Sequence, residues 1–178
     1  MPSRTIPFAV AALLLAIDRI TKIAIRGRVS FYDNIVVIPS FFSIVHTENR
    51  GAAFGFLSNS TSPLRTALLI GLSSAVMILI CRLLWNPARA GLGNGWLARF
   101  GLAFVLGGAA GNLYDRVIRG AVTDFLEFYF GSYTFPAFNA ADSAITIGAG
   151  LLLLEMWLSH QRHGTTPAAA PANPEKAG

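Results

Sequence analysis

The chain alternates between long apolar runs and shorter polar stretches. Four runs reach the roughly 20 mostly apolar residues that a helix needs to cross a bilayer. They cover about residues 6–25, 64–85, 97–114 and 140–158. The second run is the clearest, whereas the latter half of the first carries charged residues. The pattern predicts an integral membrane protein, mainly α-helical, with four transmembrane helices in residues 1–160 and a disordered tail rich in proline and alanine over residues 161–178.

The two longest links between these runs differ from plain linkers. Residues 34–57 and 120–138 contain runs of β-branched and aromatic side chains, which are interrupted by turn residues such as Pro39. Such runs predict short strands or hairpins. Their Phe and Tyr side chains suit the boundary between lipid and water. We therefore expect a small β-rich cradle that rests on the membrane surface.

Composition agrees with this class and excludes others. Hydrophobic residues make up 53% of the chain and charged residues 13%, against about 25% charged residues in a soluble domain. The net charge is +5, but the basic residues are scattered, so we expect no nucleic-acid partner. The single cysteine, Cys81, lies in an apolar run and can form neither an intrachain disulfide nor a zinc site by itself.

Charge does not decide the orientation in the membrane. Four spans would place both termini on one side, with six Lys and Arg residues there and eight on the other side. Seven of the nine acidic residues belong to the second side: Asp18, Asp33, Glu48, Asp115, Asp124, Glu127 and Asp142. We therefore expect many basic residues on that side to form local ion pairs. A reporter fused to the C-terminus should then be cytoplasmic, and an extracytoplasmic signal would contradict this orientation.

Polar residues from several separate segments gather at one end of the predicted spans. They are Asp18, Lys22, Asn49, Asn112, Asp115, Arg116, Asp124, Asn139 and Asp142. Polar groups in or beside a membrane are costly unless they are paired, hydrated or functional. Their common depth predicts a site at the membrane–water boundary.

Two pairs in this group have helical spacing. Asp18 and Lys22 are four residues apart, so they share a helix face and are expected to satisfy each other. Asn112 and Arg116 are also four apart. The fork of Arg116 matches a carboxylate or a substrate carbonyl, but an arginine here can equally extend its charge to the interface. Spacing does not separate these two interpretations.

Asp124 and Asp142 are the candidates for chemistry. Each has a structural interpretation when taken alone: Asp124 as a turn or edge residue, and Asp142 as an acid at the positive end of a helix dipole. Two carboxylates brought close together share one proton. The ionised one can accept a proton from water while the other protonates or polarises a carbonyl, which is amide hydrolysis without metal, serine or cysteine.

Other chemistries and other functions find less support. The chain has no H-E-x-x-H pattern for a zinc protease, and Ser73 in the second run has no histidine within a span to activate it. A Ser–Lys dyad that uses Lys22 stays open on composition, although Asp18 is a nearer partner. An ion pathway or transporter would need charges at several depths. A purely structural subunit would use Asp142 only as a cap and "GGAAG" only as a packing surface.

Five motifs together resemble lipoprotein signal peptidase, the type II signal peptidase of bacteria. They are "DRITK" from Asp18, "ENRGAAFGFL" from Glu48, "GGAAGNLYDR" from Gly107, "GAVTDF" from Gly120 and "FNAADSAITIG" from Phe138. They occur in order and with suitable spacing between Asp18 and Gly148. The resemblance implies an aspartic endopeptidase that removes signal peptides from diacylglyceryl-modified prolipoproteins and cuts just before the lipidated cysteine.

The resemblance also implies particular residues and a location. The catalytic aspartates fall on Asp124 and Asp142, and the polar residues that support them or the substrate fall on Asp18, Lys22, Asn49, Asn112, Arg116 and Asn139. The family implies four transmembrane helices in the bacterial cytoplasmic (inner) membrane, both termini in the cytoplasm, and an extracytoplasmic active site under the β-rich cradle. We expect no cofactor or metal, a monomer, and prolipoprotein and membrane lipid as partners.

Overall fold

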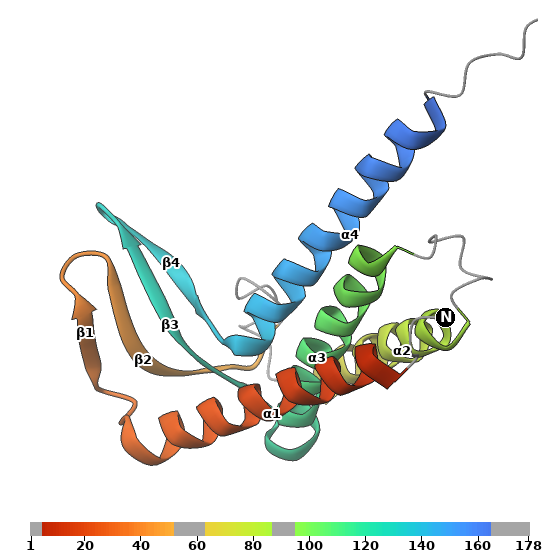
Figure 1. The fold of residues 1–178 in the computed structure, drawn as a ribbon. Coiled ribbons are helices and arrows are strands. Elements are labelled where there is room, and N and C mark those ends of the chain that lie inside the picture. The colour runs from red at the N-terminus through yellow and green to blue at the C-terminus, as the bar shows by residue number, and fades with distance from the viewer. Residues whose placement is uncertain (1–4, 52–62, 87–94, 165–178) are drawn as a thin grey trace, which may run out of the picture.

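The computed structural model describes residues 5–51, 63–86 and 95–164 and shows four long helices with one small sheet at their end (Figure 1). In chain order the elements are α1 (Thr5–Arg28), β1 (Asn34–Ile38), β2 (Phe42–Asn49), α2 (Pro63–Trp85), α3 (Trp96–Arg119), β3 (Val122–Phe130), β4 (Tyr133–Phe138) and α4 (Ala140–Gly164). The helices coincide with the four predicted apolar runs, and the strands with the two links predicted to contain β-structure.

Three of the helices are long and apolar enough to cross a membrane, over Thr66–Trp85, Trp96–Arg119 and Ala140–Gln161. Helix α1 is as long as α3, but charges in its C-terminal half keep it outside this set. Helix α3 continues past residue 114, the end of the third predicted run, to Arg119, so Asp115 and Arg116 are helical. Helix α4 likewise continues through residues 161–164, while the rest of the predicted tail, 165–178, lies outside the described residues.

Helix α3 is the centre of the bundle and packs against α1, α2 and α4. Glycines allow this close approach. A Cβ added at Gly107 would lie 2.7 Å from the backbone oxygen of Ala11 in α1, and one at Gly108 would lie 2.4 Å from that of Ala141 in α4. Small residues at close spacing permit such tight packing between helices. Helix α2, by contrast, exposes most of its apolar side chains, as a helix in contact with lipid would.

The sheet is antiparallel with the strand order β1-β2-β3-β4. Strand β3 follows directly from α3 through Gly120, whose φ of 72° places it in the left-handed region that ends many helices. Strand β4 leads through Asn139 into α4. The sheet is thus joined to the ends of α3 and α4, and these two junctions carry the candidate residues. Strand β1 at the sheet edge is exposed along its whole length although four of its five residues are apolar.

Candidate active site

The site is built on the first turn of α4. Asn139 precedes the helix, and its side-chain Oδ1 accepts a hydrogen bond of 3.0 Å from the backbone N–H of Asp142. The carboxylate Oδ2 of Asp142 accepts one of 3.2 Å from the backbone N–H of Asn139. This reciprocal arrangement is a capping box, which satisfies two backbone donors at the start of a helix. The predicted role of Asp142 at the helix start is confirmed, and the cap also holds its carboxylate in one place.

Two side-chain amides connect Asp142 with Asp124. Asn112 in α3 donates from Nδ2 to Oδ1 of Asp142 at 2.7 Å. Asn139 donates from Nδ2 to Oδ1 of Asp124 at 2.6 Å and to Oδ1 of Asn112 at 3.3 Å. Asp124 and Asp142 lie eighteen residues apart in the chain, and the fold brings both carboxylates into hydrogen-bond contact with the same residue, Asn139.

Asp124 lies in β3 and is almost fully buried, with 2% of its surface exposed. Burial, together with the nearby negative charge of Asp142, raises the pKa of the Asp124 carboxyl from 3.8 to about 7. Hydrogen bonds from the side chains of Asn139 and Asn49 and the positive charge of Lys22 act in the opposite direction. A buried acid that titrates near neutral pH beside a second acid is a candidate for general acid–base chemistry.

A buried ion cluster, made of Asp18, Lys22 and Asp115, lies next to these amides. The Nζ atom of Lys22 lies 2.9 Å from Asp18 Oδ2 and 3.1 Å from Asp115 Oδ2, and all three side chains are inaccessible to solvent. The predicted Asp18–Lys22 pair is therefore confirmed. Asp115 also pairs with Arg19, and lies 3.7 Å from Arg26. Because the ammonium group of Lys22 is engaged by these two carboxylates, the Ser–Lys alternative is disfavoured.

The buried ion cluster ties the site-bearing elements to α1. Asp18 Oδ1 accepts a hydrogen bond of 3.0 Å from the backbone N–H of Ala141 in the first turn of α4. Asp115 Oδ2 accepts one of 3.5 Å from the backbone N–H of Thr123, the residue before Asp124. Sequence reasoning grouped Asp115 with the polar residues but gave it no role. Asp115 lies three residues after Asn112, so both side chains share one face of α3. This spacing was the signal in the sequence that could have indicated a role for Asp115 in the site.

Ion pairing of the basic residues on this side is also confirmed. Arg19, Lys22 and Arg26 face the acids of the buried ion cluster. Arg119 at the end of α3 lies 3.3 Å from the carboxylate of Glu48 in β2. Such pairs explain why a count of basic residues is a poor guide to orientation in this chain.

Arg116 binds backbone carbonyls of its own chain. Its Nη1 donates to the oxygen of Asn112 at 3.3 Å, and its Nη2 donates to the oxygen of Gly51 at 3.2 Å. The side chain is half-buried and connects α3 to the residues that follow β2. Both contacts are made with the protein's own backbone, so they do not separate the two interpretations left open by spacing. Binding of a substrate carbonyl stays a prediction.

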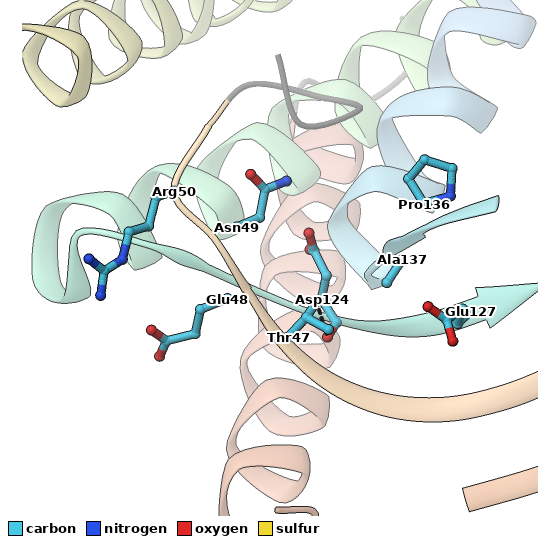
Figure 2. A pocket seen from close by; sticks show the side chains of 8 residues that line it. All are labelled: Thr47, Glu48, Asn49, Arg50, Asp124, Glu127, Pro136 and Ala137. Atoms are coloured by element: carbon cyan, nitrogen blue, oxygen red, sulfur yellow. Dashed lines mark hydrogen bonds between the residues drawn. The ribbon is translucent and has the colours of Figure 1, made fainter. Parts of the chain in front are cut away.

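A cavity of about 370 Å³ lies over the sheet beside Asp124 (Figure 2). The lining residues come from the end of β2, from β3 and from β4: Thr47, Glu48, Asn49, Arg50, Asp124, Glu127, Pro136 and Ala137. Figure 2 shows the Asp124 side chain rising from β3 among them, with Asn49 to one side and Pro136 and Ala137 to the other. A peptide held in this cavity would meet the Asp124 carboxyl directly. Among the described residues, no group of three or more His, Cys, Asp and Glu side chains is placed to hold a metal ion.

Comparison with known proteins gives consistent matches over most of the chain. A family model described as "Signal peptidase (SPase) II" matches residues 10–158. The lipoprotein signal peptidase of Solibacter usitatus is 49% identical over 149 residues, which cover 84% of this chain and 88% of that protein. The lipoprotein signal peptidase of Pseudomonas putida is 45% identical over 83% of this chain and 84% of that protein. A solved structure described as a bacterial membrane enzyme matches with a TM-score of 0.74 and 26% identity, over 92% of this chain and 93% of that one.

Proposed function

This chain belongs to the signal peptidase II family, whose members are aspartic proteases that remove signal peptides from prolipoproteins, and we propose that Asp124 and Asp142 together perform the cleavage. The substrate is a prolipoprotein that carries a diacylglyceryl group, and the bond cut is the one just before the lipidated cysteine. The observation that supports this assignment is that both carboxylates accept a hydrogen bond from Asn139. Asp124 accepts it from the side-chain amide and Asp142 from the backbone N–H. The side-chain amide of Asn139 also donates to that of Asn112.

The environments of the two aspartates assign their roles. The raised pKa of Asp124 leaves that carboxyl protonated below about pH 7, so Asp124 is the proton donor of the proposed pair. Asp142 accepts a proton from water as the water oxygen attacks the carbonyl carbon, and Asp124 gives its proton to the carbonyl oxygen. As the tetrahedral intermediate collapses, the C–N bond breaks, Asp142 gives its proton to the departing nitrogen, and one hydroxyl of the intermediate returns a proton to Asp124. The proposed reaction thus uses only water, the peptide and the two carboxyl groups, and it needs no further reactant.

The supporting residues hold this geometry. Asn112 and Asn139 fix the carboxylates by hydrogen bonds, and Asn49 hydrogen-bonds to Asp124 from the cavity side. Asp18 and Lys22 act from the buried ion cluster. Arg116 holds Gly51 through the backbone carbonyl of that residue. Preorganised groups of this kind lower the barrier because they do not reorganise during the reaction.

The location of the dyad suits a lipid-anchored substrate. We infer that all four helices cross the inner membrane, with both termini in the cytoplasm and the dyad at the extracytoplasmic face. The charges of α1 are compatible with a span because Asp18 and Lys22 are buried and paired inside the bundle. The exposed apolar side chains of β1 then lie in the interface between lipid and water. The C-terminal reporter distinguishes this orientation from its reverse.

The pH dependence of cleavage should follow the protonation of Asp124. Because its pKa is raised to about 7, the carboxyl loses its proton as pH rises through this value, and the proton donor of the proposed reaction is lost. We expect kcat/KM to fall as pH increases above about 7. Initial rates in buffers of constant ionic strength measure this, and a rate that keeps increasing into the alkaline range would contradict the assignment of the proton to Asp124.

Cleavage by the purified protein tests the proposed function. A prolipoprotein whose cysteine carries a diacylglyceryl group should be cut to leave that cysteine as the new N-terminus, as shown by mass spectrometry. The same polypeptide without the lipid serves as the control and should be cut poorly or not at all. A transporter or a structural subunit would leave both substrates intact, and cleavage at another bond would contradict the proposed specificity.

A further inference from the structure

We propose that Lys22 is a positioning residue that determines which way the two amides between Asp124 and Asp142 face. This assignment rests on the proposed catalytic role of the two aspartates. Lys22 lies in α1 and belongs to the buried ion cluster, and it is not one of the residues that line the cavity. Its influence on the reaction would therefore pass through other side chains.

The first amide is oriented directly. The ammonium group of a lysine carries three N–H donors and no acceptor. The Nζ atom of Lys22 lies 2.9 Å from the side chain of Asn112, so the amide atom that faces it must be the oxygen. The NH₂ group of Asn112 then faces Asp142, to which it donates at 2.7 Å. The reverse orientation would set NH₂ against ammonium and oxygen against carboxylate, which is unfavourable at both ends.

The second amide is oriented through the first. Because Oδ1 of Asn112 is an acceptor, the atom of Asn139 that lies 3.3 Å from it must be the donor nitrogen. The same nitrogen donates to Asp124 at 2.6 Å, and the oxygen of Asn139 is left to accept the N–H of Asp142 at 3.0 Å. One lysine thus sets the polarity of both amides, and each aspartate receives one amide N–H.

The lysine itself is held by contacts with three side chains. Its other two short contacts are with carboxylates from two helices, Asp18 in α1 at 2.9 Å and Asp115 in α3 at 3.1 Å. Arg19 and Arg26 flank Asp115 on the side of α1, and Thr123 contacts it from β3. One hydrogen bond and two ion pairs hold the ammonium group in place. Its positive charge also opposes the rise in the pKa of Asp124, so it acts on the dyad through electrostatics as well as through orientation.

Lys22→Met tests this role, because methionine keeps much of the side-chain volume and removes the charge and the donors. We expect kcat to fall roughly 100-fold, as for a small misplacement of catalytic groups. KM should change by less than about twofold, because the interaction removed is not one made with substrate. The fall of kcat/KM at high pH should move to higher pH, since the loss of the positive charge raises the pKa of Asp124.

Arg28→Met is the matched control, because it removes an exposed charge from the end of the same helix. We expect its kcat, its KM and the pH dependence of its kcat/KM to be unchanged.

Binding of uncleaved substrate separates positioning from folding. The measurement is the Kd of the diacylglyceryl-modified peptide in an Asp124→Asn background, with and without Lys22→Met. The proposal expects equal Kd values within about twofold. Loss of binding as large as the loss of kcat would show a general role in folding and overturn it. Lys22→Gln, which keeps a donor and an acceptor but no charge, is measured alongside. Failure of both variants to bind peptide would also overturn the proposal.

The outcomes distinguish this proposal from the proposed function. If the wild-type protein leaves the lipidated substrate uncut, or if Asp124→Asn retains full activity, the catalytic assignment itself fails. If the wild type cuts, Asp124→Asn does not, and Lys22→Met keeps the wild-type rate and pH profile, the dyad stands and the role of Lys22 is overturned.

Discussion

Replacing Asp124 or Asp142 by asparagine, one at a time, is expected to abolish prolipoprotein cleavage while the protein stays folded in the membrane. Loss of a general acid or base typically costs between 10²- and 10⁴-fold, and each carboxyl here is proposed to handle a proton in both steps, so a loss of at least about 1,000-fold is expected. Folding should survive because asparagine keeps an oxygen for the contact of Asp124 with Asn139, and one oxygen for either of the two contacts of Asp142, with Asn112 or with the backbone N–H of Asn139. Cleavage rates and the amount of membrane-inserted protein measure the two effects.

Asp33→Asn is the matched control for these substitutions. Asp33 is an exposed aspartate before β1, and its carboxylate accepts a hydrogen bond of 2.8 Å from the backbone N–H of Ser30. The same chemical change there should leave the cleavage rate within about twofold of wild type, as for most surface substitutions. Substantial activity in Asp124→Asn or Asp142→Asn would refute the dyad. Loss of inserted protein in either variant would instead assign that carboxyl a role in folding.

Gly108→Val should destabilise the bundle and reduce activity together. A Cβ at Gly108 would lie 2.4 Å from the backbone oxygen of Ala141 and 2.8 Å from the side chain of Ile145. The nearer atom belongs to the backbone, so no rotamer change can relieve the clash and α3 and α4 must separate. Overpacking of this kind costs typically about 1–3 kcal/mol. Because Ala141 precedes Asp142, the separation also moves the dyad.

Gly150→Val in α4 is the control for this prediction. Gly150 is exposed, and a Cβ there would meet no atom within 4 Å. Valine is also a slightly better helix former than glycine, so stability should be unchanged or slightly higher. Thermal unfolding in detergent and the cleavage rate are measured for both variants. If Gly108→Val unfolds at the wild-type temperature and cuts at the wild-type rate, the close approach of α3 and α4 at this glycine is not required.

Most of the local structure could be predicted from the sequence. The four helices were predicted because a long apolar run is a property of neighbouring residues, and the strands because β-branched and aromatic runs alternate with turn residues. The capping position of Asp142 and the pair between Asp18 and Lys22 depend on spacings of three and four residues within or beside one helix. Helix ends were less predictable, since the polar residues Asp115 and Arg116 resembled a loop but are stabilised in the helix by partners from α1 and from Gly51.

The sequence by itself determined the residue types that the site uses and their position at one end of the predicted spans, because apolar length and helical spacing place them along the chain. Tertiary structure alone decided how they meet. Asn139 could be assigned a cap from its position, but its hydrogen bond to Asp124 depends on β3 and α4 returning to the same place. Asp115 became part of the buried ion cluster only because α1 packs on α3. The orientation of two amides by one lysine requires α1, α3 and the start of α4 together, since hydrogen-bond polarity is a property of contacting groups and not of sequence spacing.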